Sequence, residues 1–264
     1  MSAGNGGWEL PISEGELSRL TRELDEAHRE YLPAMHAAAA DLTEEVRASR
    51  RRFLMGTGAV AAGLALAACS SSSTKSTAGA ASSSAGAASA SATASSMYTG
   101  DLQVVALATA LENQAVGAYG AALTAAKAGK LGAVPPAVAT FATTAMSQHA
   151  DHAKAWNAVL TGAGKPAITT VPLSNQPATL QALGAVTDVG GVAKLALMLE
   201  NQAAQTYLFA TYNVTSPAGI ATAASIAPVE AMHAAILNFV LGQYPVPDDF
   251  LPVDKAASPT LLTV

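Results

Sequence analysis

The chain has 264 residues, one cysteine and a formal net charge of −5, so it can form no intramolecular disulfide. Residues 70–264 carry seven Lys and Arg against nine Asp and Glu, and this near-neutral balance argues against nucleic acid as a partner. The same part is rich in Ala, the strongest helix former, and has few β-branched runs that alternate with period two. The composition therefore predicts an all-α protein.

Residues 1–48 form a charged segment with a helical pattern. Ser13 is an expected helix N-cap, and after it apolar side chains recur near helical spacing with charges between them. His28 and His36 have no other His or Cys three or four residues away, so we expect solvated histidines rather than metal ligands. We interpret residues 1–48 as a cytoplasmic extension that is removed together with the signal that follows.

Residues 49–69 contain the three parts of an export signal in the usual order. Arg50 and Arg51 begin a basic stretch, and an apolar run follows over residues 53–68. The run ends in Leu66-Ala67-Ala68-Cys69, so small residues precede the cysteine. A basic segment, a short apolar segment and a small-residue cleavage site define a secretory signal, whereas a membrane-spanning helix needs about 20 apolar residues.

Two resemblances suggest how this signal is used. The pair Arg50 and Arg51, followed by Phe53-Leu54, resembles the signal that the twin-arginine translocase recognises. The tetrad that ends in Cys69 resembles a lipobox, in which the cysteine is lipidated and becomes the new N-terminus. The resemblances imply that the translocase exports the chain and that a lipid anchors it to the extracytoplasmic face of a bacterial cell membrane. An uncleaved membrane anchor is the alternative.

Two further segments flank the expected folded domain. Residues 70–97 are almost entirely Ser, Ala, Thr and Gly, which cannot bury enough apolar surface to offset the entropy of ordering, so they predict a flexible linker. Residues 244–264 are rich in Pro and Asp and are expected to pack against the domain as an extended tail.

Proline and glycine divide residues 98–243 into four expected helices. Their expected ranges are 98–129, 136–160, 189–213 and 217–242. Glycines follow the first, second and fourth helices, and prolines open the second and fourth, as helix termini favour. The connection over residues 164–188 contains three prolines and predicts a long crossover. Pro228 is expected to kink the last helix.

An internal repeat links the two helix pairs. Residues 111–119 (Leu-Glu-Asn-Gln-Ala-Val-Gly-Ala-Tyr) match residues 199–207 (Leu-Glu-Asn-Gln-Ala-Ala-Gln-Thr-Tyr). The two segments share Leu, Glu, Asn, Gln, Ala and Tyr at the same places, so Glu112 corresponds to Glu200. The repeat indicates a duplicated helical hairpin.

After residue 70 the chain contains only three Glu and three His, spread over the four expected helices. These residues are Glu112, His149, His152, Glu200, Glu230 and His233. Side chains three residues apart share a helix face, so Glu230 and His233 can converge on one point. The glutamates have apolar neighbours and no adjacent Lys or Arg, so metal coordination is the natural compensation for burying them.

This pattern over residues 98–243 resembles the ferritin-like superfamily, and most closely the exported bacterial lipoproteins that carry a ferritin-like domain. Dimetal proteins of that superfamily take one Glu from each of two helices and a Glu-x-x-His motif from each of the other two. The resemblance implies a four-helix bundle with a long crossover. The implied ligands are Glu112 and Glu200 as terminal carboxylates, Glu230 as a bridging carboxylate, and His152 and His233 as paired imidazoles.

The chain departs from that pattern on the second helix, where His149 stands in place of a Glu. One bridging carboxylate is then missing, which leaves open whether His149 binds and whether the site holds one ion or two; Asp151 could approach only if the helix were rotated. Imidazole and carboxylate donors suit Fe, Mn or Zn, and we expect Fe or Mn. Tyr119 and Tyr207 lie seven residues after their glutamates and are candidates for hydrogen bonds to the ligands.

We therefore expect an exported metal-binding protein, either a redox enzyme that acts on dioxygen or peroxide or a non-catalytic protein for metal sequestration or stress. A structural bundle without metal is a third hypothesis, and a homodimer is left open. The twin-arginine system carries folded proteins, often with a cofactor already bound, which suits a metal inserted in the cytoplasm. No nucleophile–base arrangement and no phosphate-binding glycine loop is recognisable, so hydrolysis and nucleotide chemistry have no support.

Overall fold

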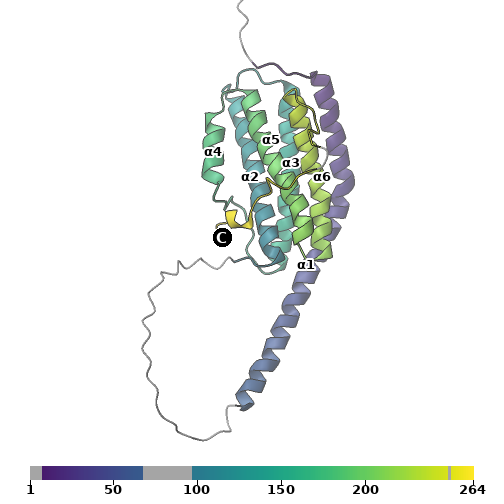
Figure 1. The fold of residues 1–264 in the computed structure, drawn as a ribbon, viewed down its shortest axis with the longest axis vertical. Coiled ribbons are helices and arrows are strands. Elements are labelled where there is room, and N and C mark those ends of the chain that lie inside the picture. Colours follow the sequence, from purple (N-terminus) through teal and green to yellow (C-terminus); the bar gives the residue numbers. More distant parts are fainter. Residues whose placement is uncertain (1–7, 68–96, 249–250) are drawn as a thin grey trace, which may run out of the picture.

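The computed structural model describes residues 8–67, 97–248 and 251–264, without the side chains of residues 50 and 52–67 (Figure 1). The described residues form α-helices, one short 3₁₀ helix and no β-strand, which confirms the all-α prediction. The helices are α1 (Glu14–Ala67), α2 (Asp101–Lys127), α3 (Pro136–Gly162), α4 (Gln176–Ala185), α5 (Val189–Asn213) and α6 (Pro217–Val240), followed by η1 (Pro259–Leu261).

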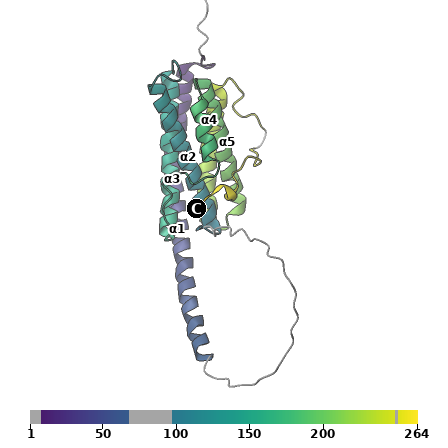
Figure 2. The same ribbon diagram turned by 90° about the vertical axis from the view of Figure 1, so that its left-hand side faces the viewer.

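The helices α2, α3, α5 and α6 are the four expected ones and lie side by side along the long axis (Figures 1 and 2). The pairs α2/α3 and α5/α6 form two hairpins, and α2 packs against α5 where the hairpins meet. The crossover contains the short helix α4, which lies outside α2 and α5. The arrangement is the ferritin-like bundle with its long crossover.

The ends of these helices follow the turn chemistry of the sequence. Gly129 after α2 and Gly242 after α6 have φ values of 72° and 70°, a left-handed conformation that glycine adopts without steric cost. The Lys130 amide then donates to the carbonyl of Ala125 (3.0 Å), which closes α2 in a Schellman motif. At the start of α6, the Ser216 hydroxyl accepts from the Gly219 amide (3.0 Å) as an N-cap.

The interior of the bundle has an apolar cluster toward each end and a polar layer between them. One cluster includes Leu107, Trp156 and Ile226, and the other includes Phe141 and Ile236. Helices α2, α3, α5 and α6 each contribute to both clusters, and their buried Glu and His residues lie between the two contributions or just inside the second one. The polar layer is therefore screened from solvent along the bundle axis on both sides.

Helix α1 adds a fifth helix that the sequence reasoning did not place in the bundle. Its first part lies in the groove between α3 and α6 and packs against both, whereas α3 and α6 make little direct contact with each other. The buried side chains of α1 recur at spacings of three, four or seven residues, as in a coiled-coil seam, and Thr43 adjoins the last of them. They are Leu17, Thr21, Leu24, His28, Met35, Ala39, Leu42 and Thr43.

The two N-terminal histidines therefore have different environments. His36 is exposed, as expected. The expectation that His28 is solvated is wrong, because only 4% of its surface is exposed. The charged residues around His28 concealed its seam position in the sequence, and that position became visible only with the packing of α1 against α3 and α6.

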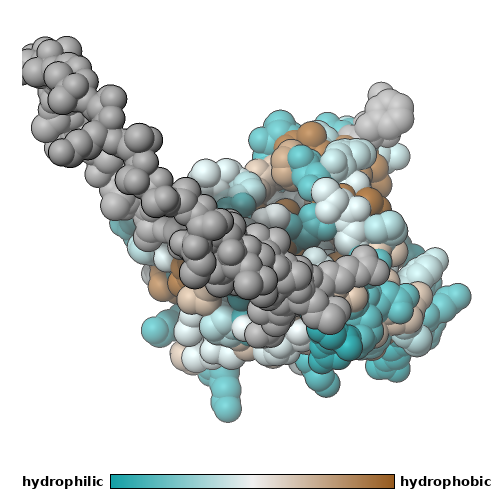
Figure 3. Space-filling model, turned by 90° about the horizontal axis from the view of Figure 1, so that it is seen from below, coloured by the Kyte–Doolittle hydropathy of each residue, from teal (hydrophilic) through white to brown (hydrophobic). Residues whose placement is uncertain are grey.

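The last part of α1 continues as a helix to Ala67 and projects beyond the end of the bundle (Figures 1 and 2). Cys69 and the side chain of Arg50, two residues of the expected signal, lie outside the described part. Among described helices, α6 alone is long and apolar enough to cross a membrane, but 56% of its apolar stretch is buried in the bundle, as in the core helix of a soluble protein. Figure 3 views the bundle from the end beyond which α1 projects. The surface that the grey residues leave visible there carries only scattered hydrophobic residues.

The C-terminal tail lies along the bundle. The amide of Lys255 donates to Gln205 Oε1 (2.7 Å) and that of Ala257 donates to Thr206 Oγ1 (2.8 Å), which fixes the tail to α5. Its last residues pair with the crossover through an isolated bridge between Leu173 and Leu262. Both contacts hold the crossover and α4 in place beside α2 and α5.

We predict that Ile226→Ala lowers the free energy of unfolding by about 2–5 kcal/mol, because Ile226 is fully buried in α6 and its truncation leaves a cavity. Leu180→Ala on α4 is the matched control: this side chain is 55% exposed, and we expect a change within about 0.5 kcal/mol. Urea denaturation of the two variants measures both values. Equal effects would contradict the placement of the core.

Candidate metal centre

The structure brings the six predicted donor residues together in the polar layer of the bundle. Each is at most 2% exposed: Glu112 from α2, His149 and His152 from α3, Glu200 from α5, and Glu230 and His233 from α6. The helical spacing explains the convergence, since residues three apart on α3 and on α6 point the same way. The alternative ligand Asp151 is part of neither group of converging donors.

The donors form two overlapping groups of four, and each group has its ligand atoms within 4.8 Å of one another. One group contains Glu112, His149, His152 and Glu230, and the other contains His149, Glu200, Glu230 and His233. His149 and Glu230 belong to both. The geometry therefore provides two adjacent candidate cation positions with two shared residues.

The two shared residues lie between the groups in different ways. His149 directs Nδ1 to Glu112 Oε2 (2.7 Å) and Nε2 to Glu200 Oε1 (3.1 Å), so one ring nitrogen faces each group. Glu230 Oε1 lies 2.9 Å from His152 Nδ1, and its Oε2 lies 3.2 Å from His233 Nδ1. A single imidazole and a single carboxylate thus connect the two groups.

The positions of two of these atoms suit a shared cation better than a hydrogen bond between them. His152 Nδ1 and Glu230 Oε1 are buried and only 2.9 Å apart, yet neither makes a hydrogen bond of acceptable geometry with any group. A buried polar atom without a partner is costly. Donor atoms that converge on a common point without pointing at each other are the arrangement that a coordinated cation requires, so the residues fit a metal ion.

Hydrogen bonds from outside the groups orient the carboxylates. Tyr119 of α2 donates to Glu200 Oε1 on α5 (2.5 Å), and Tyr207 of α5 donates to Glu112 Oε1 on α2. This crossed pair follows from the internal repeat, because each tyrosine lies seven residues after its own glutamate and serves the other one. Trp156 Nε1 donates to the Tyr207 hydroxyl (2.9 Å). Each tyrosine hydroxyl thus orients the glutamate carboxylate of the other hairpin.

Two residues near the centre were missed by the sequence reasoning. Gln148 Oε1 accepts from His233 Nε2 (2.8 Å), which fixes the ring so that Nδ1 faces the donors. His28 of α1 packs on His152 with ring centroids 5.3 Å apart, and its Nε2 is buried without a hydrogen-bond partner. Gln148 adjoins a predicted ligand, which was the one available signal, whereas His28 lies far away in the sequence.

The imidazoles and carboxylates change each other's acidity. Burial alone would lower the pKa of His152, but the carboxylates of Glu112 and Glu230 outweigh burial and raise that pKa to about 9. Burial would raise the pKa of Glu112, but the neighbouring imidazoles lower it to about 2. In the same way, the neighbouring carboxylates raise the pKa of His149 well above its ordinary value. The neighbouring imidazoles lower the pKa of Glu200 well below its ordinary value. Ion pairs thus stabilise these buried groups in the protein alone.

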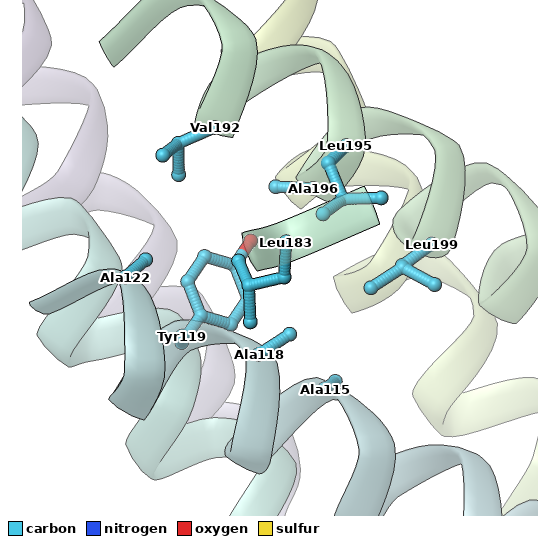
Figure 4. Close-up of a pocket in the computed structure, with 9 residues that line it drawn as sticks. All are labelled: Ala115, Ala118, Tyr119, Ala122, Leu183, Val192, Leu195, Ala196 and Leu199. Carbon is cyan, nitrogen blue, oxygen red and sulfur yellow. The ribbon is translucent and has the colours of Figure 1, made fainter. Parts of the chain in front are cut away.

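A small apolar pocket lies beside the centre between α2, α5 and α4 (Figure 4). Its volume of about 10 Å³ suits one molecule the size of water. Leu183 of α4 and Leu195 and Leu199 of α5 line it, and the ring of Tyr119 forms one wall. Since the Tyr119 hydroxyl contacts Glu200, one aromatic ring and its hydroxyl separate this pocket from the donors.

A helical bundle in which four helices direct carboxylates and imidazoles at one point has the architecture of ferritin-like proteins. The family model described as a ferritin-like domain matches residues 100–243, more than half of the chain, and the chain belongs to this family. Neither the curated proteins nor the solved structures gave a match to the chain.

We predict that the metal-free protein is most stable near pH 6.5. The raised pKa of His152 contributes stability that is complete below 6.5, its unfolded value, and is lost as the pH rises toward about 9. Burial, followed by the charge of His152, lowers the pKa of His28 to about 4, so its contribution is lost as the pH falls from 6.5 toward 4. The contribution of Glu112 is lost further down, between 4.5 and about 2.

Urea denaturation of the metal-free protein at pH 5, 6.5 and 8.5 measures this maximum. His28→Leu should reduce the loss of stability on the acid side of the maximum. The loss on the alkaline side should stay the same, because other groups cause it. A free energy of unfolding that rises steadily up to pH 8.5 would contradict the pairing of the buried imidazoles with carboxylates.

Proposed function

We propose that this ferritin-like protein binds two transition-metal ions, Fe or Mn, in a dinuclear centre. The observation that supports the proposal is the pair of overlapping donor groups that share Glu230 and His149. Glu112 and His152 would complete one position, and Glu200 and His233 would complete the other. Nitrogen and carboxylate donors suit both metals.

His149 distinguishes this centre from the family pattern. A second Glu-x-x-His motif would supply a second carboxylate here, whereas this chain supplies a ring whose two nitrogens face different groups. With three carboxylates, the centre carries less negative charge than the family pattern with four. The simpler alternative, a single ion, would use one group of donors and leave Glu and His of the other group paired with each other.

The function we infer for the centre is redox chemistry with dioxygen or peroxide. The six donor residues would serve two ions with at most four of them at each, fewer than the six positions of octahedral Mn, so room remains for a small oxygen ligand. Bound Fe or Mn would supply electrons to such a ligand. Tyr119 and Tyr207 hold the terminal carboxylates, and burial raises the pKa of both hydroxyls well above the ordinary value, so they stay protonated as donors.

A non-catalytic role in metal sequestration or stress is the second candidate. The observation that favours it is the complete burial of the donors, since a closed site retains metal well but restricts the entry of a reactant. Consumption of dioxygen or peroxide by the metal-loaded protein distinguishes the two candidates. A loaded protein that consumes neither would support sequestration.

We further propose that the chain acts outside the cytoplasmic membrane, exported by the twin-arginine translocase and anchored through Cys69. The order of the arginine pair, the apolar run and the Leu-Ala-Ala-Cys tetrad supports this location. A folded domain that must receive metal in the cytoplasm suits a translocase that carries folded proteins.

We predict about two Fe or Mn per chain after expression with both metals, and a loss of most of this metal in Glu230→Gln, because Glu230 serves both positions. Elemental analysis of the purified protein measures the content, and Glu30→Gln on the exposed face of α1 is the matched control. About one metal per chain would favour the mononuclear alternative. A folded wild-type protein without metal would disprove the metal-binding function.

We predict that Arg50→Lys combined with Arg51→Lys keeps the protein in the cytoplasm, because the translocase recognises the arginine pair. Cys69→Ser should be exported but not lipidated, so cell fractionation should recover it away from the bilayer. Arg47→Lys, just before the signal, is the control and should behave as the wild type. Unchanged fractionation of both test variants would contradict the export route.

A further inference from the structure

We propose that residues 14–48 of α1 form a separable wall of the metal centre, which closes the centre while it lies between α3 and α6 and opens it when it leaves. The proposal rests on the proposed function for the bound metal, and on the expected signal for the event that removes the wall. The packing of α1 in the bundle carries the argument.

Helix α1 fills a groove between α3 and α6. Helices α3 and α6 together supply four of the six donors, yet they make little direct contact with each other. Helix α1 packs against both of them, and its buried residues belong to both apolar clusters. Removing α1 would therefore leave an open groove along the side of the centre on which His152 lies.

Helix α1 contacts the donors through His28. The ring of His28 on α1 packs against that of His152 at a tilt of 56°, and the buried Nε2 of His28 has no hydrogen-bond partner. A leucine at this seam position would pack without that cost. An imidazole here gives the wall a polar face toward the centre, and the departure of α1 would expose His152 directly to solvent.

Helix α1 is held in place mostly by apolar contacts. Among the described residues, every ion pair that an arginine of α1 forms is with an Asp or Glu of α1 itself. The pairs of Arg19 with Glu16 and Glu23 are examples. Two hydrogen bonds tie α1 to the bundle near the two ends of its packed part: Glu14 accepts from the Ala137 amide, and Glu45 accepts from the Ser216 hydroxyl. Apolar seam contacts provide the rest, so α1 can separate without leaving a charged group unpaired in the groove.

The topology of export is incompatible with this packing on the far side of the membrane. An export signal leaves the residues before it on the cytoplasmic side and carries the residues after it across a hydrocarbon layer about 30 Å thick. Thr43 and Gly162 lie in contact in this structure, so they cannot occupy opposite sides of a membrane at the same time. The observed packing therefore belongs to the chain before export, and cleavage at Cys69 would separate α1 from the bundle.

The close approach of Thr43 and Gly162 also provides the test. A Cβ placed on Gly162 would lie 3.4 Å from Thr43 Cβ and would collide with Thr43 Cγ2, an atom that Cys lacks. Disulfides join residues with Cβ atoms about 3.5–4.5 Å apart. Thr43→Cys with Gly162→Cys, in the full chain carrying Cys69→Ser, should therefore form a disulfide with diamide as the oxidant and lock α1 onto α3.

The first readout is metal release. The protein is loaded with Co²⁺ as the probe, and transfer of Co²⁺ to EDTA is followed with the disulfide formed and after reduction by a phosphine. We expect release to be at least about tenfold slower in the locked form, because local opening is blocked. A protease site inserted among residues 70–96 extends the test: cutting should speed release in the reduced form and leave the locked form unchanged.

A second readout needs no metal and separates this proposal from the metal-binding function. Modification of His149, His152 and His233 by diethyl pyrocarbonate, measured by mass spectrometry, should be faster after cutting and reduction than in the locked form. The single variant Thr43→Cys, treated in the same way, should show no effect of the oxidant. Equal modification in the locked and the cut, reduced forms, or failure of the disulfide to form, would overturn the proposal whether or not Co²⁺ binds.

Discussion

The burial of three carboxylates and three imidazoles in an alanine-rich interior is the constraint on which the rest of the structure depends. A buried charge costs several kcal/mol unless it is paired or coordinated. The bundle meets this requirement by bringing all six groups together, since Glu112 and Glu200 each lie against His149. The apolar clusters on either side then exclude water and strengthen the interactions inside.

The internal repeat explains how one chain could assemble such a layer. Duplication of a hairpin places one Glu-Asn-Gln segment on α2 and another on α5, and the two tyrosines then serve each other's glutamates. The symmetry fails on α3, where His149 replaces a carboxylate. Because that imidazole faces both glutamates, the substitution keeps the layer connected while it removes one negative charge.

Much of the bundle was predictable from the sequence because local chemistry determines it. Glycines with positive φ end the helices, Ser216 caps α6, and the spacing of Glu230 and His233 places both on one face. The six donors could be identified for a different reason: they are all the Glu and His residues that follow the linker. Their number and their apolar neighbours gave the prediction its strength.

Other features depend on contacts between distant parts of the chain, which no local pattern specifies. Helix α4 lies among prolines that suggest only an irregular connection, although the side chains of Gln176 and Thr179 bond Gln114 of α2. The seam of α1 has the spacing of any amphipathic helix, so its sequence does not say which surface it covers. His28 could not be assigned to the centre, because its neighbour His152 is 124 positions away and belongs to another helix.

The position of α1 connects the chemistry of the centre with the location of the protein. The donors need a closed environment to stay paired, and α1 completes that environment on the side where α3 and α6 do not meet. The signal pattern at the end of α1, residues 49–69, has the order of an export signal that would part residues 14–48 from the bundle. Metal would then be inserted while the centre can still be closed, and the exported bundle would present His152 toward solvent. The same helix that stabilises the centre during folding would thus decide when the centre becomes accessible.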